Sequence, residues 1–205
     1  MDKARAALAK NHTQDAQKAI DAALKVTPDY ADALTLRAVL EVNAQQQQAA
    51  LDDLDHAVKA DPSFGPAYLV LGALFNQMGR FDEALRSLDR ESIYNPNSWQ
   101  CAYEMSRSWL GKREYERALL QANRAQSLSG KLHPGPIHLI RGYALMGTKR
   151  LELASAEFEA YLDAEPNGQL AGSVRVALAK IKTAMAQRPD SVPLPAMSGL
   201  FASAK

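Results

Sequence analysis

Two groups of carboxylates are the residues of this chain that could do acid–base chemistry. Asp52, Asp53 and Asp55 form the first group, and Asp82 with Glu83 forms the second. Neighbouring carboxylates can share a proton and so divide the roles of general acid and general base. Both groups, however, are predicted near the starts of helices, where the helix dipole favours negative side chains. We therefore interpret them as structural rather than catalytic.

Histidine and cysteine, which often serve as metal ligands or nucleophiles, are sparse. The four histidines are His12, His56, His133 and His138. Only the last two lie close together, with two prolines between them, and we do not expect them to hold a metal. Cys101 is the one cysteine and follows Trp99 by two positions in a helical pattern, which favours a buried thiol over a reactive one. No hydrolase, nucleotide-loop or zinc-protease motif occurs, so we expect neither an enzyme nor a cofactor.

Charge is balanced overall but uneven along the chain. Lys and Arg total 24 against 23 Asp and Glu, a net charge of +1. Residues 1–98 carry a net charge of −4 and residues 99–205 one of +5. A basic cluster in the second half comprises Arg107, Lys112, Arg113, Arg117, Arg124 and Lys131. Because the chain as a whole is not basic, this cluster favours a solvated face or an acidic partner, and we expect no binding of nucleic acid.

A repeat predicts the elements that position these residues. Ala16, Ala50, Ala84 and Ala118 are each separated by 34 residues, as are Pro28, Pro62 and Pro96. Ala154 follows after 36 residues, and Pro166 again comes twelve residues after its alanine. A period of this length is typical of stacked helical hairpins. Alanine lets the two helices of a hairpin cross closely, and proline ends the second helix.

The copy at residues 65–98 shows the pattern most completely. It carries Tyr68, Leu71, Gly72, Phe75, Ala84, Leu88 and Pro96, with Gly79 in the turn between its two helices. This pattern resembles that of the tetratricopeptide repeat. The family has a large residue, Leu-Gly and an aromatic residue on the first helix, then alanine, a large residue, alanine and proline. The resemblance implies an all-α fold, a right-handed α-solenoid of helix-turn-helix hairpins with a C-terminal capping helix.

The resemblance also divides the chain into segments. These are a partial unit 1–30, full units 31–64, 65–98, 99–134 and 135–168, a capping helix 169–187 and a Pro-rich extended tail 188–205. Four positions depart from the family pattern. Glu91 and Tyr161 stand where the second alanine is usual, and Arg37 and Glu41 replace an expected apolar pair.

The end of the repeat array is predicted from a change of pattern. Val174, Leu178, Ile181 and Met185 form one apolar stripe that would cover the last repeat. The tail beyond Arg188 either docks to this chain or a neighbour, or is a disordered end or linker. No apolar run approaches the ~20 residues that span a bilayer, so we expect no membrane insertion. The compartment is not predicted.

The resemblance implies a binding surface, because the first helices of such repeats line a concave groove. The groove positions of the family correspond here to Thr35, Val39, Leu69, Ala73, Asn76, Tyr103, Arg107, Leu139 and Tyr143. The alternative for each of them is packing against the adjacent unit. If the groove binds a peptide, Tyr103 and Tyr143 are its expected anchors. Removing Tyr103 and Arg107 together is then expected to weaken binding without unfolding the chain.

Some relatives grip the C-terminal carboxylate of chaperones with Lys, Asn and Arg side chains on three first helices. The residues near those positions here are Thr35, Val39, Val70, Gln100 and Glu104, so that clamp is not predicted. We expect a module that binds another protein or peptide. Two alternatives stay open. One is a regulatory or substrate-recruiting segment of a larger enzyme or assembly complex, and the other is self-association through the tail or the charge asymmetry.

Overall fold

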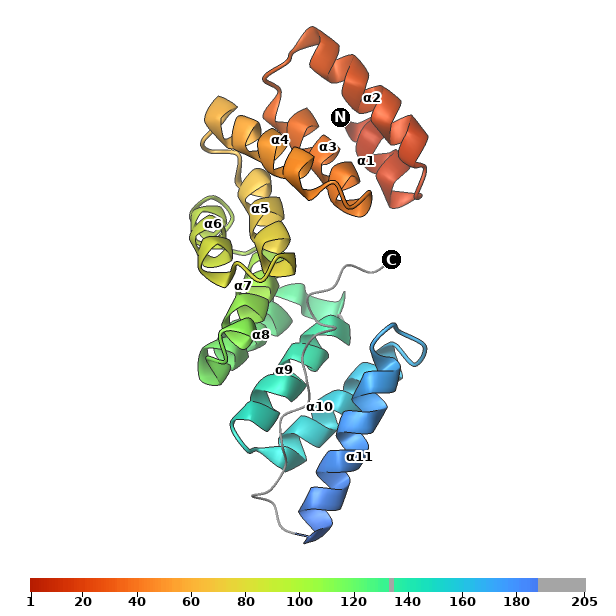
Figure 1. The fold of residues 1–205 in the computed structure, drawn as a ribbon, viewed down its shortest axis with the longest axis vertical. Coiled ribbons are helices and arrows are strands. Elements are labelled where there is room, and N and C mark those ends of the chain that lie inside the picture. Colours follow the sequence, from red (N-terminus) through yellow and green to blue (C-terminus); the bar gives the residue numbers. More distant parts are fainter. Residues whose placement is uncertain (133–134, 188–205) are drawn as a thin grey trace. The chain divides into compact units, whose positions relative to one another are not determined.

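A computed structural model describes residues 1–132 and 135–187 of the chain (Figure 1). The helices are α1 (Asp2–Ala9), α2 (Thr13–Val26), α3 (Ala31–Asn43), α4 (Gln47–Ala60), α5 (Gly65–Gln77), α6 (Phe81–Tyr94), α7 (Trp99–Gly111), α8 (Tyr115–Ser129), the 3-10 turn η1 (Gly130–Leu132), α9 (Gly135–Gly147), α10 (Leu151–Ala164) and α11 (Ala171–Gln187). Every regular element in the described residues is helical, which confirms the predicted all-α class. The predicted tail 188–205 lies outside the described residues.

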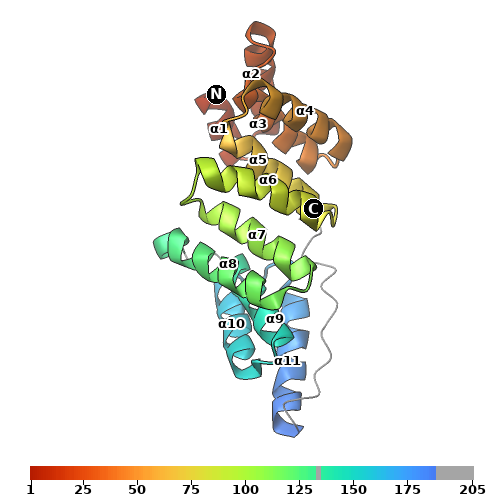
Figure 2. The ribbon, with the colours of Figure 1, turned by 90° about the vertical axis from the view of Figure 1, so that its left-hand side faces the viewer.

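The described residues form two compact units. Unit 1 comprises Met1–Phe75 and Glu83–Pro96, and unit 2 comprises Asn76–Asp82 and the described residues from Asn97 onward. In unit 1, α1 packs on α2, α2 on α3 and α3 on α4. In unit 2, α7 packs on α8, α8 on α9 and α9 on α10, and Figure 2 shows α7 beside α8. Successive helices are thus neighbours, as hairpin repeats require.

The turn inside each hairpin has the same unusual backbone. One residue with φ between 58° and 72° follows each first helix, at Asn11, Gln45, Gly79, Arg113 and Lys149. After Gln45, the N–H of Gln46 donates to the carbonyl of Glu41 at 2.8 Å, as in a Schellman motif. The sequence predicted such a turn at Gly79. The other four positions show it without glycine, because backbone hydrogen bonds hold the left-handed residue.

The repeated alanines and prolines have the places that their spacing predicts. All five alanines of the series lie on second helices and are fully buried. Pro28, Pro62, Pro96 and Pro166 each lie two positions after the last residue of a second helix. The 36-residue spacing falls in the copy where α8 runs one residue longer than α6 and is followed by η1. The irregularity therefore lies between hairpins and not within one.

Glycine on a first helix lets the second helix approach it closely. A Cβ added at Gly72 would lie 2.5 Å from Cγ of Leu88, and one added at Gly142 would lie 2.5 Å from the ring of Phe158. Neither separation is compatible with van der Waals contact. The large residue of the second helix thus occupies the space above the glycine of the first.

Gly72→Ala is expected to lower the free energy of unfolding by about 1–2 kcal/mol, because overpacking against Leu88 outweighs the helix propensity of alanine. Gly172 on α11 is the matched control, since a Cβ there meets no atom of the described structure within 4 Å. Gly172→Ala should leave stability unchanged or raise it. Urea unfolding followed by circular dichroism measures both. Equal effects of the two substitutions would contradict the close packing.

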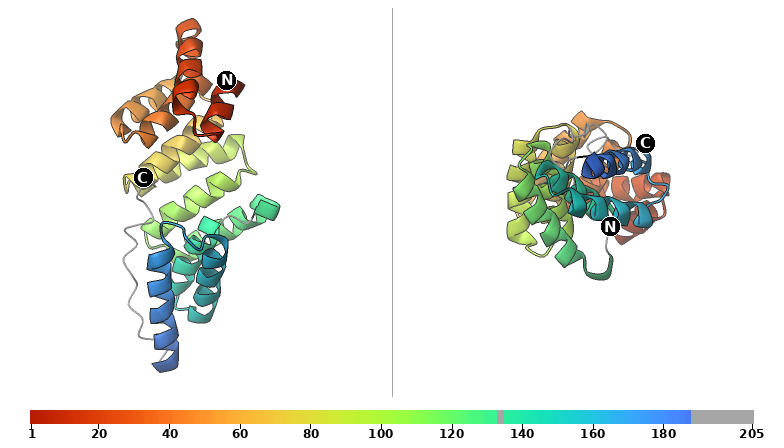
Figure 3. Two further views of the ribbon diagram at one scale, coloured as in Figure 1. Left: turned by 90° about the vertical axis from the view of Figure 1, so that its right-hand side faces the viewer. Right: turned by 90° about the horizontal axis from the view of Figure 1, so that it is seen from below.

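The last helix, α11, packs on α10 through one face (Figure 3). Val174 and Ile181 are fully buried and Leu178 is partly buried, as predicted. Met185, however, is 37% exposed, while Ala177 is buried. The helical period of 3.6 residues places Ala177 between the two buried branched residues and turns Met185 toward solvent.

Candidate functional site

The first helices of unit 1 carry four of the predicted groove residues. Thr35 on α3 is buried, and its Oγ1 donates to the carbonyl of Ala31 on the same helix at 2.7 Å. Val39 on α3, with Leu69 and Ala73 on α5, is only half-buried. Unit 1 therefore offers three apolar side chains with accessible surface, while the hydroxyl of Thr35 is committed to its own helix.

Asn76, at the end of α5, is a predicted groove residue that is completely buried in unit 2. Its Nδ2 donates to the backbone carbonyl and to the carboxylate Oε2 of Glu104 on α7, both at 2.9 Å. Its Oδ1 accepts a hydrogen bond from the hydroxyl of Ser108 at 2.7 Å. A buried amide with these partners holds helices together. The predicted role as a partner contact is not supported by this geometry.

Arg107 on α7 belongs to the same network. Its Nη1 donates to the two carboxylate oxygens of Glu104 at 3.0 and 2.9 Å, and the residue is only 8% exposed. Its guanidinium carbon lies 6.0 Å from the ring centre of Tyr103. Removing Arg107 would leave Glu104 without these hydrogen bonds in a buried place, which is costly. We therefore no longer expect the double removal of Tyr103 and Arg107 to leave the fold unaffected.

Tyr103 lies half-buried on α7, against two hydrophobic clusters of unit 2. Burial raises the pKa of its hydroxyl to about 12, and the nearby positive charge of Arg107 acts in the opposite direction. The tyrosine is therefore a neutral hydrogen-bond donor at physiological pH. Among the predicted groove residues of unit 2, Tyr103 is half-buried, while the other four are buried.

Leu139 and Tyr143 on α9 are core residues. Both belong to the largest hydrophobic cluster of unit 2, and Tyr143 is only 5% exposed. Its ring meets that of Phe158 edge-on, with ring centres 5.1 Å apart. The packing alternative therefore describes both residues better than the predicted role as groove residues.

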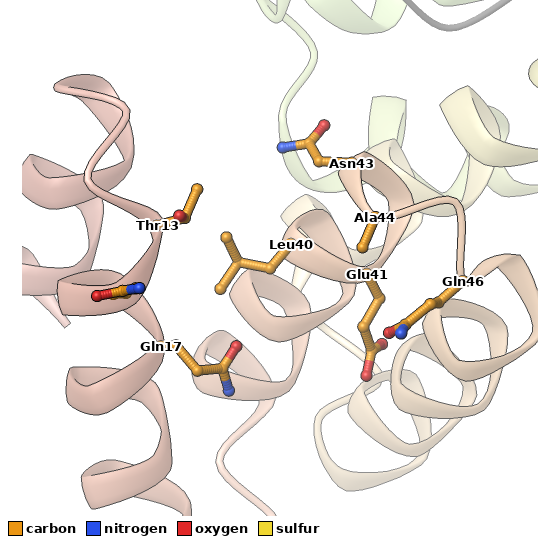
Figure 4. Close-up of a pocket in the computed structure, with 8 residues that line it drawn as sticks. Thr13, Gln17, Leu40, Glu41, Asn43, Ala44 and Gln46 are labelled. Atoms are coloured by element: carbon orange, nitrogen blue, oxygen red, sulfur yellow. The ribbon is translucent and has the colours of Figure 1, made fainter. Parts of the chain in front are cut away.

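A pocket of about 400 Å³ lies in unit 1, and none of its lining residues is a predicted groove residue. It is lined by Thr13, Gln14 and Gln17 of α2, Leu40, Glu41 and Asn43 of α3, and Ala44 and Gln46 of the following turn (Figure 4). The carboxylate of Glu41 and the carboxamide of Gln46 point toward one another there. The sequence signal for this site was the departure of Glu41 from the apolar repeat pattern.

Three of the five carboxylates considered for acid–base chemistry are engaged in ion pairs. Asp53 accepts two hydrogen bonds from Arg37 at 2.5 and 2.7 Å, Asp55 pairs with Lys59, and Asp82 pairs with Lys112. The helix-dipole explanation was wrong for the first group, because α4 begins at Gln47 and has no acidic residue in its first turn. Asp53 is held instead by the side chain of Arg37.

Part of the basic cluster is also engaged within unit 2. Arg107 pairs with Glu104, and Lys112 with Asp82. Lys112 and Arg117 flank the ring of Trp109, at 5.7 and 4.7 Å from its centre. The cluster is therefore not a continuous set of unpaired cations.

Other chemical groups give no further site within the described residues. No group of three or more His, Cys, Asp or Glu side chains among them could hold a metal ion. Cys101 is buried, as predicted. His138 bonds to Glu157 at 2.8 Å, while His133 lies outside the described residues. A search of the same residues finds no helix with the length and apolar character needed to cross a membrane.

Comparison with known proteins identifies the family of the chain and structures of the same fold. A family model described as tetratricopeptide repeat matches residues 1–63 and 69–135. Superkiller protein 3 of Schizosaccharomyces pombe is 31% identical over 81 residues, which are 40% of this chain and 6% of that protein. The chain thus spans a small fraction of the length of this relative.

Solved structures match over most of the chain. A thermophilic tetratricopeptide repeat protein of Thermus thermophilus has a TM-score of 0.68 at 19% identity, covering 88% of this chain and 95% of that one. YrrB, a tetratricopeptide repeat protein with an unusual peptide-binding site, has a TM-score of 0.61 at 18% identity, covering 84% and 93%. Identities this low show the shared fold alone.

Proposed function

Because the chain belongs to the tetratricopeptide repeat family, we propose that it is a non-catalytic module that binds a protein or peptide on the first helices of its repeats. Repeats of this family generally mediate protein–protein interactions. The observation that carries the proposal is the half-buried apolar surface of Val39, Leu69 and Ala73 on first helices. Apolar side chains with remaining accessible surface are the usual anchors for a partner.

The chemistry of these residues favours a peptide held by side-chain contacts. In unit 1, Leu69 and Val39 offer apolar surface to a bound peptide. In unit 2, Tyr103 offers an aromatic ring with a neutral hydroxyl. Neither unit offers a suitable donor to a chaperone's C-terminal carboxylate. In unit 1 the hydroxyl of Thr35 donates to its own helix, and in unit 2 Glu104 is an acceptor bound by Asn76 and Arg107. YrrB has the same fold and a peptide-binding site, which supports a peptide as the ligand class.

A second candidate is a regulatory or substrate-recruiting segment of a larger enzyme or assembly complex. The match to Superkiller protein 3 favours it, since the similar segment is 6% of that protein. The length of the open reading frame distinguishes the two candidates. A catalytic domain encoded in frame supports the second, and a short complete gene supports the first.

Peptides selected from a phage-displayed random library on the intact chain should bind at least about tenfold more weakly to Leu69→Glu. The introduced charge would remove apolar contacts with the peptide, and Leu69 is only half-buried and not a residue of the buried core. Fluorescence anisotropy of labelled peptides measures the affinity, and circular dichroism checks the fold. The matched control is Ile93→Glu on α6, a second helix of the same unit, where the side chain is 66% exposed.

Two results would count against this proposal. Equal weakening by Leu69→Glu and Ile93→Glu would point to a non-specific charge effect. Selected peptides that bind both variants like the parent would place their site away from the first helices.

A further inference from the structure

The pocket of unit 1 lies where one repeat departs from the others. The repeat spacing aligns Glu41 with Phe75, Trp109 and Leu145, which are all large and apolar. Unlike these three residues, a glutamate carries a charge, and it is smaller than the rings of Phe75 and Trp109. The departure therefore brings a carboxylate to a pocket of about 400 Å³ at the end of α3.

One carboxylate oxygen of Glu41 lacks a hydrogen-bond donor among the described residues. Its Oε2 is buried and accepts no hydrogen bond from any described residue. Arg37, one turn earlier on α3, is engaged by the two oxygens of Asp53. Burial, followed by the negative charge of Asp53, raises the pKa of Glu41, while the positive charge of Arg37 acts in the opposite direction. A cation that entered the pocket would supply the missing donor and offset this repulsion.

The rest of the lining suits a long side chain with a planar polar end. Leu40 and Ala44 provide apolar surface, and Figure 4 shows Leu40 facing the side where Thr13 and Gln17 of α2 lie. The Nε2 of Gln17 donates to Asp21 at 2.7 Å, which leaves its carbonyl oxygen as an acceptor. Gln46 carries a further carboxamide beside Glu41. Several acceptors around an apolar floor match a guanidinium on an aliphatic stem.

The geometry points to this pocket as a binding site for an arginine side chain of a partner protein or peptide, with its guanidinium on the carboxylate of Glu41. None of the pocket's lining residues is among the predicted groove residues. The pocket shares α3 with Val39, but its test reads out other residues, so its failure can be distinguished from a failure of the proposed groove. Lysine is the less suitable cation, because its ammonium is a point charge that cannot engage several acceptors in a plane.

The probe is N-acetyl-arginine methylamide, titrated into the isotope-labelled full chain and followed by amide chemical shifts. We expect saturable shifts confined to residues around Leu40–Gln46 and Gln17. The citrulline analogue, which carries a neutral urea in place of the guanidinium, is expected to cause no saturable shifts. This comparison uses the unchanged protein, so it tests the site whatever the stability of a variant. Saturation by citrulline at equal concentration would overturn the proposal.

The variant Glu41→Gln should weaken binding of the arginine probe about tenfold or more, through loss of a charge-assisted hydrogen bond. Asp55→Asn is the control, because it removes the same charge from an exposed position of α4 outside the pocket. It should leave the affinity within about twofold. Equal effects of the two variants would overturn the assignment to Glu41. Equal saturation by N-acetyl-lysine methylamide would overturn the preference for arginine.

Discussion

Replacing Phe158 by alanine is expected to lower the free energy of unfolding of unit 2 by about 3–5 kcal/mol. Phe158 is fully buried on α10, and its ring lies edge-on to Tyr143 and directly above Gly142. Truncation would leave a cavity between α9 and α10. Gly142 has no side chain that could move into this cavity. The free-energy cost of the empty cavity therefore adds to the cost of the lost apolar burial.

Urea unfolding followed by tryptophan fluorescence measures this loss, because Trp99 and Trp109 are the chain's two tryptophans and both lie in unit 2. Leu153→Ala is the control on the same helix. Its side chain is 57% exposed, so the change should stay within about 0.5 kcal/mol. A loss below about 1 kcal/mol for Phe158→Ala would contradict the tight packing above Gly142.

Replacing Glu104 by leucine is expected to cost about 3 kcal/mol of unit 2 stability. Its carboxylate accepts hydrogen bonds from Asn76 and from Arg107, and all three residues are buried. Leucine has a similar size but no acceptor. The amide of Asn76 would then lose one bond, and Nη1 of Arg107 would lose both of its bonds to the carboxylate.

The double variant Glu104→Leu with Arg107→Met distinguishes a buried ion pair from two independent residues. Removal of both charges leaves no unpaired charge behind, so the double variant should cost less than the sum of the two single ones. We expect a coupling of about 1–3 kcal/mol in the same fluorescence assay. Additive costs would show that the pair contributes nothing beyond the packing of each side chain.

The hairpins were predictable because their signals are local and repeated. Alanine at a fixed spacing predicted the close crossing, and all members of the series are buried. Proline predicted the end of the second helix in four hairpins, since it cannot donate a backbone hydrogen bond, but not the end of α8. Gly79 predicted one left-handed turn. Backbone hydrogen bonds form the same turn at Arg113 and Lys149, where the residue type gives no signal.

The roles of polar residues on first helices could not be predicted in this way. The helical period assigns a residue to a face, but it does not say which side chain from another helix will meet it. Asn76 and Arg107 were predicted to contact a partner, yet both bond to Glu104. Tyr143 likewise packs on Phe158, because Gly142 allows α10 to come close. Such contacts depend on distances between helices that spacing alone does not give.

The shared backbone of the hairpin turns has a consequence for how such repeats diversify. Main-chain hydrogen bonds fix the left-handed residue. The turn therefore does not depend on the type of side chain at this position. Gln45, Arg113 and Lys149 already differ in charge and shape at equivalent places. Residues at these turns, such as Gln46 beside the pocket of unit 1, can thus be exchanged for others of different chemistry while the hairpin itself stays the same.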